Sequence, residues 1–153
     1  MAKAEAKCTC KKCGNTFYVR VDGHSRREAD SKAEWASGWY DECPDCRAAR
    51  KEKEREDYYE AASKRDYPDL TGSEKQIKWA ITLRAKRMDQ LEKIKNNVAK
   101  KELFADFMAW IAKEHTNSAW WIDHRFENIE VFYERETAAY VAAHPELSEA
   151  KNA

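Results

Sequence analysis

The chain has 153 residues, of which 28 are basic, 28 are acidic and 37% are charged. Six Trp, seven Tyr and five Phe still supply apolar surface for a core, so the composition excludes a disordered polyelectrolyte. No run approaches the roughly 18 apolar residues of a membrane span, and residues 1–12 lack the apolar stretch of a secretory signal. These features predict a cytoplasmic protein that has no membrane partner.

Two pairs of cysteines form the clearest motif. Cys10-Lys-Lys-Cys13 is followed by Gly14, and Cys43-Pro-Asp-Cys46 repeats the two-residue gap. This gap lets a tight turn direct two thiolates at one ion, and two such turns complete a tetrahedral site. The spacing predicts one structural Zn²⁺ bound by Cys10, Cys13, Cys43 and Cys46. Four thiolates leave no open position for a catalytic water.

Two alternatives concern the cysteines. Cys8 lies two residues before Cys10, so either sulfur can reach the ion, and Cys8 stays open as a substitute ligand or a free thiol. The competing interpretation of the motif is a thioredoxin-like redox pair, but the βαβ pattern that would surround such a pair is missing. We therefore interpret the pairs as metal ligands.

The segment between the two pairs predicts a β-ribbon. Residues 16–21 alternate bulky and β-branched side chains, which favours a strand, and residues 35–40 are the expected return partner. With the cysteines, this pattern predicts a zinc ribbon over residues 1–50.

The motifs CKKCGNTFYV and CPDCRAARK resemble the zinc-ribbon family whose members read CxxCG-x-x-F at one end and CPDCRxARK at the other. The resemblance covers residues 8–51. It implies zinc on the same four cysteines and implies no catalytic residue.

The rest of the chain predicts helices. Residues 47–66 contain no Gly or Pro and are rich in Ala, Glu, Lys and Arg, so they are expected to form a helix that ends near Tyr67-Pro68, with residues 51–68 as the helical connector between ribbon and bundle. We interpret its RKEKERE run as a solvated helix face, and the alternative is a phosphate-binding strip. Thr71 or Ser73 is the expected N-cap of the next helix, and Glu74 or Gln76 is placed to complete a capping box in the first turn.

Apolar residues then recur at spacings of three and four in three stretches. The first carries Ile77, Ala80, Ile81, Arg84, Met88, Leu91, Ile94 and Val98; the second carries Leu103, Phe104, Phe107, Met108 and Ile111; the third carries Trp121, Ile122, Phe126, Ile129, Phe132 or Tyr133, and Tyr140. The fold class is therefore α+β but mostly α: a small zinc β-ribbon followed by an antiparallel three-helix bundle over residues 69–144. Residues 145–153 are expected to form a disordered tail.

A second resemblance rests on LTGSEKQIKWA and SAWWIDHR. These segments are similar to those of uncharacterised bacterial and phage proteins that combine such a ribbon with an LTGSEKQI-x-WA helix and a later WWID-x-R segment. The resemblance implies a compact protein of prophage type and supplies no reaction.

Trp120 and Trp121 cannot both face one helical core, because adjacent residues are about 100° apart. The apolar phase places Trp121 inside, so Trp120, near Asp123 and Arg125, is a candidate exposed anchor for a partner or a base. The alternative is that Trp120 packs under Trp79 or a neighbouring loop, while Asp123 and Arg125 pair.

Charge is segregated along the helical part. Residues 75–101 hold nine basic and two acidic residues, whereas residues 102–149 hold three basic and ten acidic ones. Either the two fields cancel between packed helices, or the outer faces point apart. The second case gives a basic surface for phosphates or an acidic partner, with Arg84, Lys86 and Arg87 as candidate binding residues, and an acidic surface that could imitate nucleic acid or bind a basic groove.

No combination of a nucleophile, a base and a third orienting group emerges, so we expect no enzyme and no small-molecule substrate. Two hypotheses follow. The first is a non-enzymatic zinc-ribbon protein that binds nucleic acid or a nucleoprotein complex. The alternative is a phage-encoded inhibitor that binds a host protein, such as a defence nuclease of the CRISPR type, through its acidic and aromatic helical face.

Overall fold

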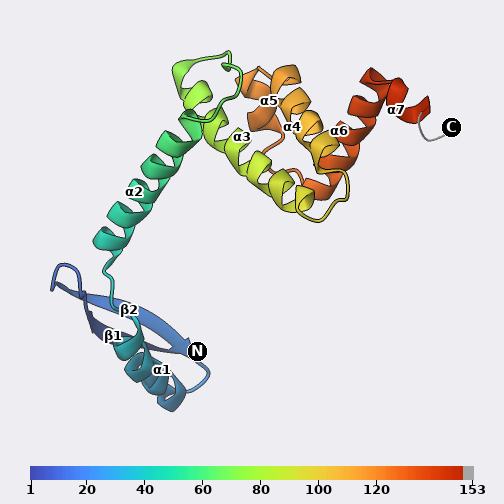
Figure 1. Cartoon of the computed structure of the whole chain (residues 1–153). Helices are drawn as coiled ribbons and strands as arrows, with labels where there is room; N and C mark the ends of the chain where they lie inside the picture. The colour runs from blue at the N-terminus through green and yellow to red at the C-terminus, as the bar shows by residue number, and fades with distance from the viewer. Residues whose placement is uncertain (150–153) are drawn as a thin grey trace. The chain divides into compact units, whose positions relative to one another are not determined.

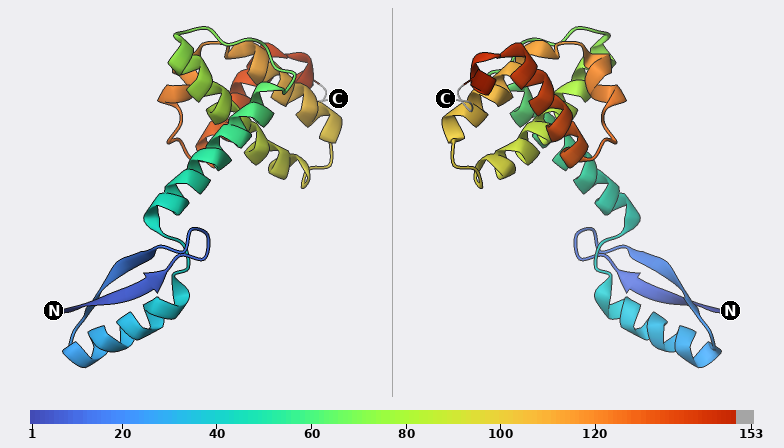
Figure 2. Two further views of the ribbon diagram at one scale, coloured as in Figure 1. Left: turned by 90° about the vertical axis from the view of Figure 1, so that its left-hand side faces the viewer. Right: turned by 90° about the vertical axis from the view of Figure 1, so that its right-hand side faces the viewer.

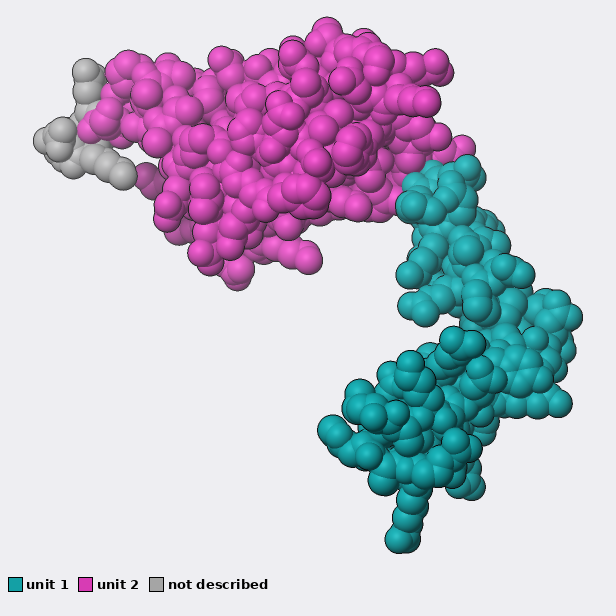
Figure 3. All heavy atoms as spheres, turned by 180° about the vertical axis from the view of Figure 1, so that it is seen from behind, with its two compact units in different colours: residues 1–56 teal, residues 57–153 magenta. Residues whose placement is uncertain are grey.

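A computed structural model describes residues 1–149 of the chain, which divides into two compact units, residues 1–56 and residues 57 onward (Figure 1, Figure 3). The elements in chain order are β1 (Ala2–Thr9), β2 (Thr16–Gly23), α1 (Arg26–Trp39), α2 (Pro44–Ser63), α3 (Glu74–Lys95), α4 (Lys101–Glu114), α5 (Ser118–Asp123), α6 (Ile129–Ala143) and α7 (Glu146–Glu149). The predicted class is confirmed at this level, because the chain is mostly helical with a small antiparallel sheet near its N-terminus. Among residues 1–149, no helix is both long and apolar enough to cross a membrane.

The first unit is a two-stranded sheet packed on one helix. β1 and β2 pair antiparallel along their whole length, from Ala2 opposite Gly23 to Thr9 opposite Thr16. Alternate residues of β1 are buried, as expected for a strand with one covered face. Helix α1 lies alongside the strands (Figure 2). The buried residues of this core are all small: Ala4, Ala6, Cys8, Ala29, Ala33 and Ala36.

The predicted return strand over residues 35–40 is wrong. These residues end α1, and the partner of β2 is β1. Ser25 caps α1 by accepting a hydrogen bond from the N–H of Glu28, and alanines at helical spacing let the helix approach the sheet closely. Gly23 permits the turn into α1, because a Cβ there would lie 2.5 Å from the backbone nitrogen of Ala29.

Helix α2 begins at Pro44, three residues before residue 47, where the sequence predicted its start. Pro44 occupies its first position, where a missing N–H costs nothing. The C-terminal part of α2 is tied to α3 within the second unit. The hydroxyl of Tyr58 donates to Asp89 over 2.9 Å, and Arg65 forms an ion pair with the same carboxylate at 2.9 Å.

The second unit begins with the predicted helix start. Ser73 caps α3 in a capping box with Gln76. Just before it, Thr71 pairs with Asn117 in a parallel bridge, so the two segments that carry the second resemblance lie side by side. Gly72, which follows Thr71 in the first segment, has a φ of +138°, a conformation that favours glycine. A Cβ at this position would lie 3.2 Å from the Cβ of Ser118 in the second segment.

The predicted third helix is two helices, α5 and α6. Asn117 caps α5 and Asn128 caps α6, each by accepting a hydrogen bond from the N–H two residues later. The intervening segment takes Phe126 out of the predicted core and leaves it 87% exposed. Of the predicted tail, residues 146–149 form α7, and residues 150–153 lie outside the described part of the chain.

Large side chains fill the core of the second unit. Its buried residues come from the segment before α3 and from α3, α4, α5 and α6: Leu70, Ala80, Met88, Leu91, Phe104, Phe107, Met108, Ile111, Ala112, Trp121, Phe132 and Tyr140. Several aromatic rings contact one another edge-on, for example Phe107 and Tyr140 with centroids 5.4 Å apart, whereas Phe104 and Tyr133 are stacked.

Candidate metal centre and adjoining groove

The four predicted cysteines lie together in the first unit. The sulfur atoms of Cys10, Cys13, Cys43 and Cys46 are all within 4.8 Å of one another. Four sulfurs at about 2.3 Å from one ion would be separated by roughly 3.8 Å along the edges of a tetrahedron. The sulfurs of Cys13 and Cys43 lie 3.7 Å apart. The donor set and its spacing therefore fit a tetrahedral thiolate site.

Two tight turns deliver these sulfurs. In the first, the N–H of Gly14 donates to the carbonyl of Cys10 over 2.8 Å, and Gly14 adopts φ of +75°. In the second, Cys43 directly precedes α2 and Cys46 lies in its first turn. The N–H of Cys46 points to the sulfur of Cys43 at 3.4 Å. Helix N-termini favour negative charge, so this turn supports thiolates.

The electrostatics of the cluster call for a cation. The backbone N–H groups of Cys43 and Cys13 lower the pKa of Cys10 to about 6. The adjacent sulfurs of Cys43 and Cys13 instead raise the pKa of Cys46 to about 12. Four thiolates this close repel one another, so they can ionise together only around a positive charge.

Glu42 joins the two turns. Its carboxylate lies 2.8 Å from Lys12 in the first turn and 3.1 Å from Arg50 of α2. The hydrogen bond from Arg50, followed by that from Lys12, lowers the pKa of Glu42 to about 2. The carboxylate therefore stays ionised and holds the two turns of the site together.

Cys8 lies outside the cluster. Its side chain is buried under α1, and the thiol lies 3.6 Å from the carbonyl oxygen of Ala36. The alternation of β1 explains this position, because Cys8 follows Ala4 and Ala6 on the covered face of the strand. In this structure Cys8 belongs to the core of the first unit.

A groove adjoins the cysteines in the same unit. It has a volume of about 450 Å³ and runs between β2 and the start of α2. Its lining residues are Phe17, Tyr18, Val19, Tyr40, Glu42, Pro44, Arg47, Ala48 and Lys51. Tyr18 is 63% exposed and Tyr40 is 40% exposed. The groove thus offers aromatic rings at the surface.

Two cations of the groove are exposed and unneutralised. Arg47 and Lys51 lie one turn apart on α2, and within residues 1–149 neither forms an ion pair. The sequence interpretation preferred a solvated face over a phosphate-binding strip for the mixed-charge run that includes Lys51, and it did not single out Arg47. Neighbouring Arg50 pairs with Glu42 and Glu54, whereas Arg47, Lys51 and Lys53 form no ion pair within residues 1–149. Of these three, Arg47 and Lys51 line the groove.

Two of the three candidate binding residues on α3 do not lie at the surface. Arg84 and Arg87 are buried, with 5% and 8% exposure. Arg84 donates to the carbonyl of Pro68 over 2.7 Å, and Arg87 donates to the carbonyls of His124 and Glu127. Both guanidiniums hold loops onto the core.

Lys86 is the exposed member of the predicted trio, and its ammonium lies 5.9 Å from the ring centre of Tyr58. A charge reversal at all three residues would therefore damage the core through Arg84 and Arg87, so it cannot serve as a test of binding.

Trp120 is partly buried and covered by its own unit. Its ring stacks on His115 with centroids 3.5 Å apart, and the guanidinium of Arg135 lies 5.7 Å from its centre. Trp121 is buried, as predicted, and its indole N–H donates to the carbonyl of His115. The cover over Trp120 comes from this aromatic stack and not from Trp79.

Asp123 and Arg125 are exposed. Arg125 lies 5.2 Å from the ring centre of Trp79 and 4.4 Å from that of Phe126. The predicted binding residues on the helices therefore do not gather around an exposed Trp120.

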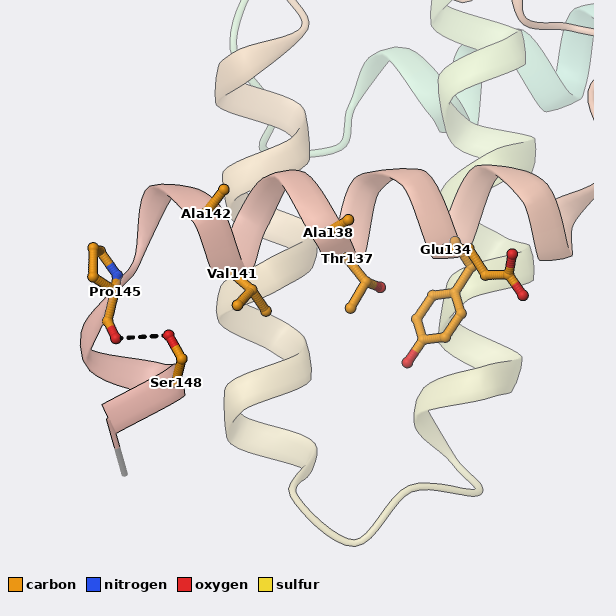
Figure 4. Close-up of a pocket in the computed structure, with 8 residues that line it drawn as sticks. Glu134, Thr137, Ala138, Val141, Ala142, Pro145 and Ser148 are labelled. Carbon is orange, nitrogen blue, oxygen red and sulfur yellow. Dashed lines mark hydrogen bonds between the residues drawn. The ribbon is translucent and has the colours of Figure 1, made fainter. Parts of the chain in front are cut away.

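A second, apolar groove lies in the second unit, along α6 and α7 (Figure 4). Thr137, Ala138, Val141, Ala142 and Pro145 line it, and Ser148 donates to the carbonyl of Pro145. Of the groups that line it, only Glu134 carries charge, so this groove lacks the cations found beside the cysteines.

Comparisons with protein-family models, with curated proteins and with solved structures found no match to this chain. The resemblance to zinc-ribbon and phage proteins stays a prediction.

Proposed function

We propose that the protein is a zinc-stabilised, non-enzymatic module that binds nucleic acid through the groove beside its cysteines. The observation that carries this proposal is the combination of exposed Tyr18 and Tyr40 with unpaired Arg47 and Lys51 around one groove. Aromatic rings stack on bases of any sequence, and cations attract the phosphate backbone. The free cations supply attraction, and the rings supply contact with unpaired bases.

Zn²⁺ is the proposed ion because a closed set of four thiolates is typical of structural zinc. Its role is to hold the two turns, and with them the start of α2 that carries Arg47 and Lys51. A reducing compartment such as the cytoplasm belongs to this proposal, since the thiols must remain free to bind the ion.

The inhibitor hypothesis has weaker support. It relies on an exposed Trp120 beside acidic residues, but His115 and Arg135 contact that ring within the same unit. We therefore propose nucleic-acid binding as the function and use protein binding as an outcome of the test.

The test measures binding of a labelled single-stranded oligonucleotide by fluorescence anisotropy at a series of salt concentrations. Log K falls as log salt rises, and each lost phosphate contact makes this slope shallower by about 0.7 for single strands. The double variant Arg47→Glu, Lys51→Glu should therefore make the slope shallower by about 1.4 and weaken binding at least tenfold.

The matched control is Lys3→Glu, Lys53→Glu, which makes the same charge change at two exposed lysines of the first unit outside the groove. Equal losses in both double variants would indicate a diffuse charge effect and contradict the groove. Binding to no oligonucleotide, at low salt and with one zinc per chain, would contradict the function itself.

A further inference from the structure

Helix α1 presents its two largest apolar side chains to solvent. Trp35 is 61% exposed and Trp39 is 66% exposed, and their rings stack with centroids 5.1 Å apart and planes 16° apart. The opposite side of the helix buries only alanines. Two stacked, exposed indoles at helical spacing do not contribute to the core, and tryptophan is enriched among the residues that anchor protein interfaces.

Gly38 lies between these tryptophans in the chain, and its missing side chain leaves open space on the exposed face of the helix, which we call the notch. Its φ is not positive, and a Cβ added there would meet no atom within 4 Å. A glycine inside a helix costs about 1 kcal/mol relative to alanine. Neither backbone conformation nor packing within residues 1–149 requires glycine at this position. The open space over Gly38 is therefore large enough to admit a side chain of another molecule.

A carboxylate borders the notch. Glu34 lies one helical turn before Gly38 on the same side of α1, is exposed, and forms no ion pair within residues 1–149. The next acidic residues along the chain, Asp41 and Glu42, already pair with Lys11 and with Lys12 and Arg50, so Glu34 is the free carboxylate beside the indoles. The negative faces of the indole rings add to this field. The surface therefore favours a cation and disfavours phosphate.

We propose that this face of α1, consisting of Glu34, Trp35, Gly38 and Trp39, binds a partner protein through an arginine side chain. The arginine stem lies in the notch over Gly38, its guanidinium stacks on an indole, and Glu34 accepts its hydrogen bonds. Arginine fits better than lysine because its planar guanidinium can stack and pair at the same time. This surface is separate from the groove that we propose for nucleic acid.

The test uses the full-length zinc-loaded protein and an amide-capped Leu-Arg-Leu peptide. Trp35 and Trp39 are the only tryptophans of the first unit, and their indole N–H signals can be assigned by single Trp→Phe changes. Titration should shift both signals, and the matched Leu-Glu-Leu peptide should not. Glu34→Gln should weaken the arginine peptide at least fivefold.

The decisive variant is Gly38→Leu, which fills the notch on an exposed helix face. It should raise the melting temperature of the first unit, keep one zinc per chain and abolish peptide binding. The proposal is overturned if the peptide shifts neither signal, or if Gly38→Leu binds as well as the parent. It is also overturned if an oligonucleotide shifts both signals while the peptide does not, or if the shifts follow protein concentration alone, which would indicate a second copy.

Discussion

The two units bury different kinds of side chain. The first packs alanines and one cysteine between its sheet and α1, whereas the second packs phenylalanine, tryptophan, tyrosine, leucine and methionine. A fully buried large apolar side chain contributes about 1.5–3 kcal/mol, and an alanine methyl contributes much less. The second unit can therefore fold by apolar burial, while the first needs another source of stability. The four clustered cysteines supply it if they bind an ion.

Removal of the metal should give the largest difference between the units. Binding of structural zinc is worth about 10–16 kcal/mol in small zinc domains, and that free energy is folding free energy. Chelation or Cys43→Ser should unfold residues 1–56 and leave the helices of residues 57 onward intact. Amide hydrogen exchange, read separately for the two units, measures this.

The matched control is a fragment that starts at Asp57, so that it keeps the contacts of Tyr58 and Arg65 with Asp89. A start near Asp69 would remove them. The fragment should melt cooperatively with or without chelator. If chelation melts α3 to α6 in the full chain, the two units share one cooperative core and the comparison between them fails.

A cavity in the core of the second unit should give the next largest effect. It should destabilise the second unit and leave the first unit intact. Trp121→Ala should cost about 3–5 kcal/mol in the free energy of unfolding, because the buried indole leaves a cavity and an unpaired carbonyl at His115. Trp120→Ala should cost about 1–2 kcal/mol, since its ring is partly exposed but stacked on His115.

Chemical denaturation of each variant measures these changes, with zinc content as the control. Both variants should keep one zinc per chain. A silent Trp121→Ala together with an unfolded Trp120→Ala would reverse the assignment of the buried ring.

The sequence predicted what depends on local spacing. The CxxC gaps located the four cysteines, and Ser73 with Gln76 located the start of α3. Arg84 shows why features that depend on distant contacts were harder to predict. The helical period placed it on the buried face, whereas its charge suggested a surface, and only the distant carbonyl of Pro68 explains how the buried guanidinium is satisfied.

Residues 35–40 illustrate a second limit. Their aromatic side chains favour a strand by propensity, but the cap at Ser25 and the alanine spacing of residues 29–36 determine a helix. The groove was hidden for a similar reason, because the partners of Arg50 had to be known before Arg47 and Lys51 emerged as free cations.

Acid should weaken the second unit through Glu136. This carboxylate is buried and lies 2.9 Å from the ring of His115, with Arg135 at 3.2 Å. Burial opposes its ionisation, but the hydrogen bond from His115 and the charge of Arg135 outweigh burial and lower the pKa of Glu136 below its ordinary value of 4.5. The stability that this group contributes is therefore complete above pH 4.5 and is lost as pH falls through its folded-state pKa.

Glu136→Gln keeps the shape and removes the charge. It should cost about 1–2 kcal/mol at neutral pH and flatten the acid limb of the stability curve of the Asp57 fragment. Measuring the fragment excludes acid release of zinc from the first unit. An unchanged acid limb in Glu136→Gln would assign the pH dependence to other groups.

The smallest effect is expected at Cys8. Comparing it with Cys10 distinguishes, within one unit, a cysteine that packs in the core from one that binds the ion. Cys8 is buried beside Ala36, away from the other four sulfurs, so it should act as a small apolar core residue. Cys8→Ala should cost about 1 kcal/mol or less and leave one zinc per chain. Cys10→Ala should lose the ion and unfold the unit, although it is the same substitution made only two residues away. Zinc content by mass spectrometry under native conditions, together with the melting temperature, separates the two roles. Loss of zinc in Cys8→Ala with retention in Cys10→Ala would mean that β1 slides by two residues to bring Cys8 to the ion, and the register of Cys8 opposite Phe17 would then not be the one that the metal selects.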